Sequence, residues 1–385
     1  MITLNNVHQI NEATAGSISI NNDKITHLNG QHRDALQLHF DDAVVFPGLI
    51  NSHDHLDFNL FPQLGNRIYN NYVEWGNYIH QAFKDEIAAV LKVPVALRTQ
   101  WGIYKNLLAG VTTVVNHGKK LTPSNGLITV FEQYQSLHSV KLEQRWKLKL
   151  NNPAHLGELL AVHIGEGTDA GAYEEINNLI RWNVLQRPLI GIHGVAMDVQ
   201  QAKSFKALVW CPESNYFLIG KTARIAALKE QLPILFGTDS TLSGNWNIWH
   251  HLHLAQQENA LTLHELWHSL NVIPAAIWGF DTGIIAPGYD ADLVVAKTKD
   301  NDYTINSVLG TDPENILLVM HRGQIRLFDE MLYPQLNTID RSPFSKVRLG
   351  SGYKYIYGDL PALVQNIRRY FPDASFPIET DFAHT

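Results

Sequence analysis

Two histidines, His53 and His55, have the residue type and spacing that most directly suggest chemistry. They follow a short apolar run within VVFPGLINSHDHLDFN, which extends from residue 44 to residue 59. Side chains two residues apart on an extended strand point to the same side, so both imidazoles can reach one ion. Such a pair is a plausible half of a metal site. It also occurs as ordinary surface or core residues, so its meaning depends on partners further along the chain.

Polar residues that could be such partners follow other apolar runs. They are His117 after VTTVVN, His163 in LLAVHI, His193 at the end of PLIGIH and Asp239 after ILFGT. In a (β/α) barrel, functional side chains gather at the carboxyl ends of the strands. Any one of these histidines taken alone is more often a structural residue, and His117 most of all. Their repeated placement after apolar runs nevertheless indicates one shared site.

The elements that would carry these residues are short apolar strands separated by helices. Continuous apolar runs lie at residues 44–50, 111–115, 159–164, 188–193, 206–211 and 233–237, and a seventh strand is expected within SVKLEQRWKLKL, residues 139–150. Such runs are typical of parallel strands that are buried on both faces. We therefore expect an α/β fold with a TIM-like (β/α)8 barrel. Only 46 residues separate His117 from His163, so a strand or helix there must be short, merged or missing.

Both chain ends have a different pattern. Residues 1–45 alternate apolar and polar positions between Asn, Asp and Gly turns, and residues 281–330 return to that alternation. We expect the two segments to form one small composite β-sandwich beside a barrel of residues 46–280. LTLHELWHSLNVIPAAIWGF is expected to form two helices. The extension 331–385 contains one clear helix, ALVQNIRRYF, and no recognisable motif.

Composition favours a globular protein with small-molecule partners. The chain has 385 residues, of which 45% are hydrophobic, and a net charge of −7 without long runs of one sign. These properties offer no footprint for nucleic acid or an anionic membrane. A single cysteine excludes an internal disulfide framework, and no signal-peptide layout or apolar run of spanning length is visible. We expect a cytoplasmic enzyme, and a homo-oligomer stays open.

Several motifs together resemble the amidohydrolase superfamily, within it the branch of cytosine deaminase and triazine hydrolase. PGLINSHDHL looks like the first-strand His-x-His motif of that family, GVTTVVNH like its next strand, and HIGEG like the fifth-strand His-x-x-Glu of the deaminases. GIHGVAMD, VWCPESN and FGTDS resemble the segments of strands six, seven and eight. GIIAPGYDADLVV resembles the return into the β-sandwich. The resemblance covers most of the chain.

The resemblance implies a mononuclear metal site. One divalent ion would be bound by His53, His55, His163 and Asp239, with Zn²⁺ as the first choice and Fe²⁺ as the alternative. Family members with two metals use a carboxylated lysine on the fourth strand, and Lys147 and Lys149 lie in that region. The His-x-x-Glu pattern belongs to the branch with one metal, which we therefore expect here.

The same resemblance assigns catalytic roles. Glu166 would carry a proton from the attacking water to a ring nitrogen, and a solvated loop carboxylate is the structural alternative. His193 would form a hydrogen bond with the attacking oxygen. Asp239 would both touch the metal and accept a proton. We also expect substrate contacts from His117 and from Trp246, and the aromatic residues Phe58, Phe61, Tyr69, Tyr72 and Trp75 could line a pocket for a planar heterocycle.

Three functions compete on this basis. The first is hydrolytic deamination of an amino-substituted heterocycle by metal-activated water, and the second is ring opening of a cyclic amide such as an imidazolone or hydantoin. The third is a metal-binding module without catalysis. The joint presence of Glu166, His193 and Asp239 argues against the third function. The sequence does not name the substrate.

Overall fold

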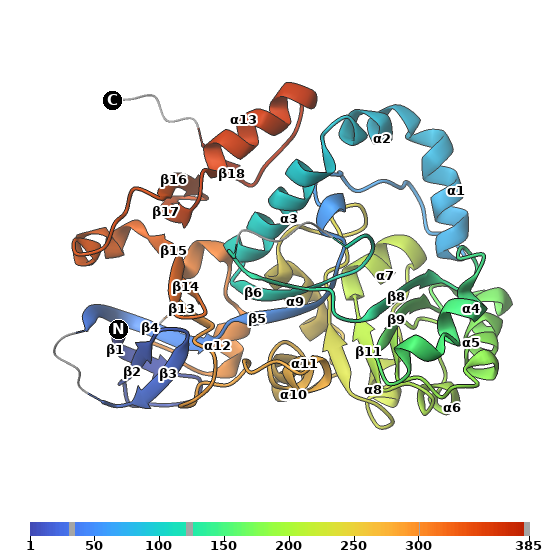
Figure 1. Cartoon of the computed structure of the whole chain (residues 1–385), viewed down its shortest axis with the longest axis horizontal. Helices are drawn as coiled ribbons and strands as arrows, with labels where there is room; N and C mark the ends of the chain where they lie inside the picture. Colours follow the sequence, from blue (N-terminus) through green and yellow to red (C-terminus); the bar gives the residue numbers. More distant parts are fainter. Residues whose placement is uncertain (31–34, 121–125, 300, 381–385) are drawn as a thin grey trace.

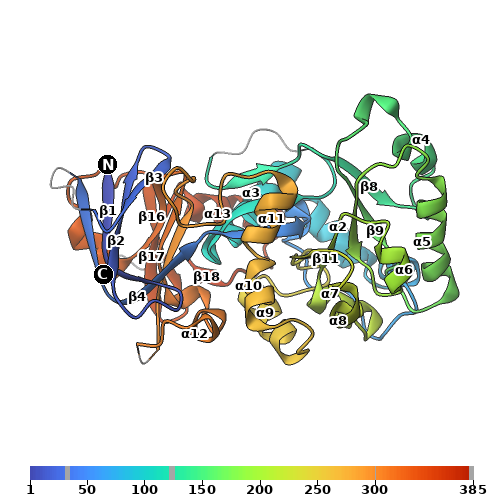
Figure 2. The same cartoon turned by 90° about the horizontal axis from the view of Figure 1, so that it is seen from below.

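The computed structural model describes residues 1–30, 35–120, 126–299 and 301–380. It divides into two parts, which lie at opposite ends of the view in Figure 2. One part contains parallel strands surrounded by helices, and the other is a large mixed sheet. Within the described ranges, no helix is long and apolar enough to cross a membrane.

The parallel strands form two sheets. A three-stranded sheet has the order β5-β6-β7 and a five-stranded sheet has the order β12-β11-β10-β9-β8. Their bounds are β5 Leu49–Asp54, β6 Val111–Asn116, β7 Thr129–Phe131, β8 Gln135–Ser139, β9 Leu160–Ile164, β10 Leu189–His193, β11 Ala207–Trp210 and β12 Ile234–Phe236. Every residue of β5, β6 and β9 to β12 is buried, as expected for strands covered on both faces.

The two parallel sheets meet at the site end of β5. The backbone N–H groups of Thr238 and Asp239, just after β12, both donate to the carbonyl oxygen of His53, at 3.1 and 3.0 Å. Gly237 makes this close approach possible, because a Cβ there would lie 2.8 Å from the Cβ of His53. The last strand of the five-stranded sheet is therefore attached directly to the first strand of the three-stranded sheet.

Helices connect and cover these strands. Their bounds are α1 Tyr72–Ala82, α2 Lys84–Leu91, α3 Val95–Leu108, α4 Trp146–Leu150, α5 Ala170–Trp182, α6 Val199–Ala202, α7 Pro212–Ile219, α8 Ile225–Leu228, α9 Ile248–Gln257, α10 Leu263–His268 and α11 Val272–Trp278. Single-turn 3₁₀ helices occupy Leu56–Phe58 and Pro153–His155. The segment expected to form two helices indeed forms α10 and α11. Thr262 and Glu265 form a capping box at the start of α10.

The second part is a ten-stranded sheet built from both chain ends, in the order β18-β16-β17-β15-β14-β13-β4-β1-β2-β3. Figure 1 shows its N-terminal strands in blue beside the orange to red strands. The bounds are β1 Ile2–Gln9, β2 Gly16–Asn21, β3 Lys24–Leu28, β4 Leu36–Pro47, β13 Leu293–Lys297, β14 Ile316–His321, β15 Gln324–Asp329, β16 Phe344–Leu349, β17 Gly352–Tyr357 and β18 Ile378–Glu379. Because β4 extends to Pro47 and β5 begins at Leu49, Gly48 separates the two parts.

The C-terminal extension contributes more than the expected helix. Strands β16, β17 and β18 come from it and extend the large sheet. Its helix α13, Leu360–Tyr370, buries Leu360, Leu363, Val364 and Ile367, a spacing that gives one apolar face. Short helices α12 Ile305–Leu309, Pro313–Asn315 and Glu330–Leu336 complete the second part. The domain boundaries expected at residues 45, 280 and 330 stay a prediction.

The prediction of a strand within residues 139–150 is wrong. That segment forms a turn followed by the short helix α4, with Lys147 and Lys149 on its surface. The strands between His117 and His163 are instead β7 and β8, which lie only a few residues apart without a helix between them. β7 is partly buried throughout, and β8, with the sequence QSLHS, buries only Leu137 and Ser139 and lacks the continuous apolar run that identifies the other parallel strands.

A buried polar network lies below the end of β5. The Lys105 ammonium on α3 donates to Asp54 Oδ2 at 3.0 Å and to Asn59 Oδ1 at 3.2 Å, and lies 3.4 Å from Thr238 Oγ1. Asn106 also donates to Asp54 Oδ2, at 2.7 Å. Lys105 and Asp54 are 1% and 0% exposed, so each charge depends on the other.

Replacing Lys105 by Met should lower the free energy of unfolding by about 3–5 kcal/mol, because Asp54 would keep a buried charge without its cation. Chemical denaturation followed by circular dichroism measures this change. The double variant Lys105→Met/Asp54→Asn should recover part of the loss, since neither charge remains. Additive losses in the double variant would contradict the proposed coupling of the two charges.

Candidate metal centre and active site

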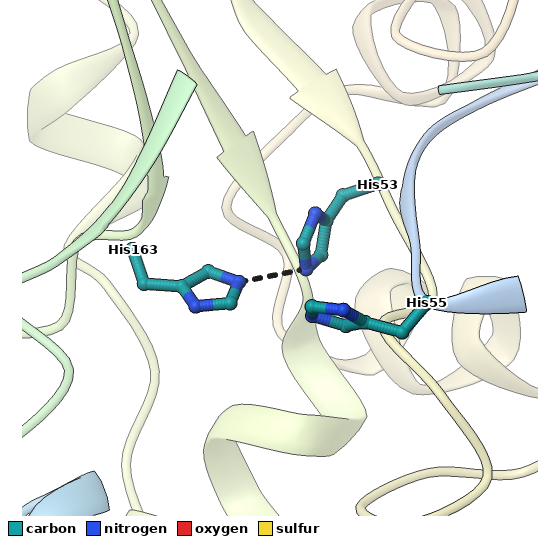
Figure 3. A group of neighbouring side chains, drawn as sticks. All are labelled: His53, His55 and His163. Atoms are coloured by element: carbon teal, nitrogen blue, oxygen red, sulfur yellow. Dashed lines mark hydrogen bonds between the residues drawn. The ribbon is translucent and has the colours of Figure 1, made fainter. Parts of the chain in front are cut away.

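Three of the predicted ligands converge on one point. His53 and His55 come from the end of β5 and His163 from β9, and Figure 3 shows their rings directed toward one another. The Nε2 atoms of His53 and His163 lie 3.1 Å apart. Ligand atoms of the three histidines all lie within 4.8 Å of one another. The three side chains are buried, at 1%, 8% and 6% exposed.

This arrangement fits a divalent cation. Burial and the neighbouring His53 lower the pKa of His55 to about 3, and burial also holds the pKa of His163 well below its usual value. Both rings are therefore neutral at pH 7, with nitrogen lone pairs available as ligands. Two ring nitrogens at 3.1 Å need either a shared proton or a cation between them. Neutral imidazoles of this kind are ligands that suit a divalent transition-metal ion.

Asp239 faces the same point from the end of β12. Its Oδ1 lies 3.6 Å from the Nε2 atoms of both His53 and His55. Its Oδ2 accepts hydrogen bonds from Ser214 and Ser243, each at 2.8 Å. Burial alone would raise the pKa of Asp239, but the hydrogen bond with His53 and the nearby histidines hold this pKa well below its usual value. Asp239 is thus a fixed carboxylate with one oxygen directed at the histidines.

Glu166 and His193 form a pair beside the three histidines. Glu166 is 4% exposed, and its Oε2 lies 3.7 Å from Nε2 of His193. Burial, and then the charge of Asp239, raise the pKa of Glu166 well above its usual value. The Nδ1 atom of His193 lies 2.9 Å from Asn215 Oδ1, an acceptor, so Nδ1 carries the proton. Burial lowers the pKa of His193 to about 4, which leaves its Nε2 as an acceptor at neutral pH.

The backbone at two of these positions is in the left-handed region. His193 has φ of 71° and Asp239 has φ of 57°, which is uncommon for residues with a side chain. Each conformation turns the chain sharply where its strand ends. Such strained positions concentrate at functional sites, because only the surrounding structure holds them.

His117 is next to the centre but does not line its cavity. Its ring stacks on His163 with 4.5 Å between ring centroids, and it is 1% exposed. Its Nε2 lies 3.1 Å from Ser136 Oγ, and its buried Nδ1 has no hydrogen-bond partner. His117 therefore exposes no surface to the cavity through which it could make the substrate contact that the sequence predicted. Its ring instead packs against the ring of His163.

A cavity of about 340 Å³ opens onto the centre. Glu166, His193 and Asp239 line its inner end, together with His55 and His163. Four of the aromatic residues that the sequence suggested also line the cavity, namely Phe58, Phe61, Tyr72 and Trp75. Tyr69 does not line it. A second cavity of about 510 Å³ surrounds Glu132 and Tyr134 and contains none of the residues of the centre.

Trp246 lies elsewhere. It borders a separate depression with Trp101 and Phe376, which contains neither Glu166 nor any of the histidines. The segment after Asp239 leads away from the cavity before it reaches Trp246. The sequence could not reveal this direction, because proximity to Asp239 along the chain was the only indication.

The sequence reasoning missed several contributors. His138, on β8, lines the cavity and belongs to a second possible ligand group with His117 and His163. His138 lies near the end of β8, a position that would have marked it as a site candidate if β8 had been recognised as a strand from the sequence. Ser214 and Ser243, which orient Asp239, are small polar residues without any distinctive motif.

The lysines considered for a second metal are outside the centre. Lys149 pairs with Glu143 at 2.9 Å, and Lys147 lies 3.9 Å from the centre of the Trp182 ring. Neither lines the cavity. These positions give no support to a bridging carboxylated lysine.

The model of the family described as "Amidohydrolase family" matches residues 154–326. These residues include β9 to β12, with His163, Glu166, His193 and Asp239. Among curated proteins, the chain is similar to an imidazolonepropionase of Thermoplasma volcanium. The two are 23% identical over 358 residues, which cover 76% of this chain and 87% of the other.

Solved structures share the fold. One is a mutant of the atrazine chlorohydrolase of Arthrobacter aurescens TC1 in complex with zinc and atraton, with a TM-score of 0.66 and 16% identity over 97% of this chain and 100% of that chain. Another is an adenosine deaminase of Xanthomonas campestris with bound zinc, with a TM-score of 0.69 and 16% identity over 96% and 97% of the two chains. The similarity extends over nearly the whole of this chain.

We expect one tightly bound divalent ion per chain, measured by elemental analysis. The double variant His53→Ala/His55→Ala should lose the ion, because two ligands are removed. Its circular dichroism spectrum should stay unchanged, because the centre lies at the strand ends and outside the apolar cores.

The matched control is His39→Ala/His264→Ala, which removes two exposed histidines distant in sequence and should keep the ion. Two equivalents of metal in the unaltered chain, or none after metal reconstitution, would contradict the assignment.

Proposed function

We propose that this chain, which belongs to the amidohydrolase superfamily and is a metal-dependent hydrolase of carbon–nitrogen bonds other than peptide bonds, deaminates an amino-substituted heterocycle. The observation that carries the proposal is the buried Glu166, with its raised pKa, beside three converging histidines and Asp239. The substrate is a small molecule that enters the 340 Å³ cavity.

His53, His55, His163 and Asp239 would hold the ion, and neutral imidazoles with one carboxylate suit Zn²⁺ first and Fe²⁺ second. When bound, such an ion lowers the pKa of water and so makes a nucleophile available at neutral pH. The lowered pKa values of His55 and Asp239 keep both groups in the form that binds a cation. Ser214 and Ser243 orient the carboxylate for this role.

Glu166 would carry the proton. Water adds to the carbon that bears the amino group, and one of its protons moves through Glu166 to the adjacent ring nitrogen. The second proton of the water is transferred to the amino group as the carbon–oxygen double bond forms, the carbon–nitrogen bond breaks and ammonia leaves. The raised pKa of Glu166 moves its protonation equilibrium toward neutral pH, where uptake and release of a proton are both accessible. Burial keeps bulk water from exchanging this proton.

His193 and Asp239 would orient the attacking water. The Nε2 atom of His193 has no proton in the neutral ring and accepts a hydrogen bond from the water. The Oδ1 atom of Asn215 fixes this tautomer, because it accepts the hydrogen bond from Nδ1 of His193. Asp239, as a carboxylate, can accept the second proton of the water. His117 and His138 are further polar groups near the centre.

The similarity to a protein named imidazolonepropionase supports the ring-opening alternative. The composition of the cavity supports deamination over the ring opening of an acidic substrate. Its described lining contains no lysine or arginine, whereas it contains two carboxyl groups, Glu166 and Asp239. A substrate with its own carboxylate would find no cation there to pair with.

The proposal includes the complete (β/α)8 barrel of the family fold. The five-stranded and three-stranded parallel sheets would be its two arcs, joined by the hydrogen bonds from Thr238 and Asp239 to His53. The distortion lies between β7 and β8, which are not paired with each other. This is the segment in which a short, merged or missing strand or helix was expected, and no helix lies between β7 and β8. Cytoplasmic location and a homo-oligomer stay expectations.

Glu166→Gln should separate binding from catalysis. The amide keeps the shape of the carboxyl group but cannot carry the proton, so kcat should fall by about 100-fold or more. Metal content should be unchanged. Glu174→Gln, an exposed carboxyl on α5, is the control and should keep full activity. Normal turnover in Glu166→Gln would remove Glu166 from the mechanism.

A substrate screen distinguishes deamination from ring opening. We expect ammonia release from a member of a panel of aminopyrimidines, aminopurines, aminotriazines and pterins, and no reaction with hydantoins or imidazolones. Attack at a carbon bearing NH₂ builds charge on the adjacent ring nitrogen, which Glu166 can protonate. Ring opening without ammonia, abolished by Asp239→Asn, would overturn deamination. Inactivity with metal fully bound would favour the non-catalytic module.

A further inference from the structure

We propose that the outer half of the catalytic cavity is a subsite for an uncharged apolar substituent on the heterocycle. This inference rests on the proposed function, because the inner half of the same cavity would hold the reacting ring. It predicts a substrate that is polar at one end and carries an alkyl, thioether or aryl group at the other.

The subsite is formed by α1, α2, the turn after β8 and neighbouring loops. Its apolar lining residues are Phe61, Trp75, Ile79, Ile87, Leu91, Leu142, Leu218 and Leu242, whereas Phe58 stacks on the His55 ring at the inner end. Carbon atoms from six separate segments, α7 among them, therefore face one space. A lining of this kind favours apolar ligand groups, because their transfer from water is favourable and no polar group is left unpaired.

The aromatic residues of the subsite direct their polar atoms away from it. Trp75 donates its indole N–H to the carbonyl oxygen of Leu64, at 2.6 Å. Tyr72 donates its hydroxyl to Glu175, at 3.2 Å. Both groups are thus already paired with protein atoms. The two rings offer hydrocarbon surface to a ligand, and their hydrogen bonds hold them in fixed orientations.

Two leucines at the outer end are unusually exposed. Leu91, at the end of α2, is 51% exposed, and Leu142, in the turn after β8, is 50% exposed. Single exposed leucines are common on protein surfaces, as Leu148 at 71% illustrates on α4. Leu91 and Leu142 differ because both line the catalytic cavity, whereas Leu148 does not. A bound apolar group would cover them.

The charge distribution gives the ligand a direction. Both carboxyl groups of the described lining, Glu166 and Asp239, are at the inner end with the metal ligands. The outer end has no lysine, arginine, asparagine or glutamine among its described lining residues, and His80 is its polar group. A phosphate, carboxylate or sugar at this end would lose water without gaining matched partners. The polar heterocycle therefore belongs inside and the apolar substituent outside.

A series of 1-alkylimidazoles tests the subsite on the metal-loaded protein without any reaction. The ring nitrogen binds divalent ions, and the alkyl group on the opposite nitrogen extends outward. Calorimetry from methyl to n-butyl should give a Kd that falls about fourfold for each methylene that becomes buried. 1-(3-carboxypropyl)imidazole should bind at least about tenfold more weakly than the n-butyl compound.

Leu91→Ser and Leu142→Ser should each weaken the dependence of Kd on chain length while leaving the Kd of the methyl compound nearly unchanged. The matched control is Leu148→Ser, which removes an equally large exposed leucine outside the cavity and should behave as the unaltered chain. A Kd independent of chain length, tighter binding of the carboxylate, or an equal effect of Leu148→Ser would overturn the subsite.

The ammonia screen tests the deaminase proposal and the calorimetry tests the subsite, so either one can fail without the other. Length-dependent binding without ammonia release would support the subsite and reject the deaminase. Ammonia release together with a Kd that does not change with the alkyl-chain length of the imidazoles would support the deaminase and reject the subsite.

Discussion

The buried ion pair between Lys105 and Asp54 is the interaction on which the geometry of the centre depends. Asp54 lies between the metal-binding candidates His53 and His55, so its side chain points opposite to theirs. Lys105 pairs with it at 3.0 Å and also reaches Thr238, the neighbour of Asp239. One cation thus connects the strand ends that carry three of the four expected ligands. Because both charges are buried, the pair tolerates little displacement.

Burial also sets the protonation states of the centre. Removal from water disfavours charge, so the imidazoles of His55, His163 and His193 are neutral and Glu166 gains affinity for a proton. Asp239 is the exception, because hydrogen bonds from serines and the neighbouring histidines stabilise its charge. The same dry environment therefore yields neutral ligands, a fixed carboxylate and a group able to exchange a proton.

The cavity divides along its depth. Its inner end combines carboxyl groups and imidazoles, and its outer end combines aliphatic and aromatic surface. The inner end is built by residues at the ends of parallel strands, where the backbone is held on both sides. The outer end is built largely by α1, α2 and the turn after β8, which can differ in sequence without disturbing the strands. On the proposed function, chemistry and substrate preference would consequently depend on different elements.

The sequence by itself determined the strands with continuous apolar runs and the residues at their ends. A parallel strand buried on both faces must be apolar throughout, so residues 111–115, 159–164, 188–193, 206–211 and 233–237 coincide closely with strands of the structure. The resemblance to the superfamily came from the motifs on those strands, and the family model matches residues 154–326, which include four of them. Convergence of His53, His55 and His163 was expected from the same strand ends.

Only the tertiary structure decided the remainder. Strand β8 has the sequence QSLHS and lacks the apolar run, so its His138 could not be recognised as a cavity residue. Trp246 follows Asp239 in sequence, yet the chain leads it to another depression. The extension forms β16 to β18 because a distant sheet edge offers backbone partners. These features depend on contacts between residues far apart in the chain, which local periodicity and spacing do not encode.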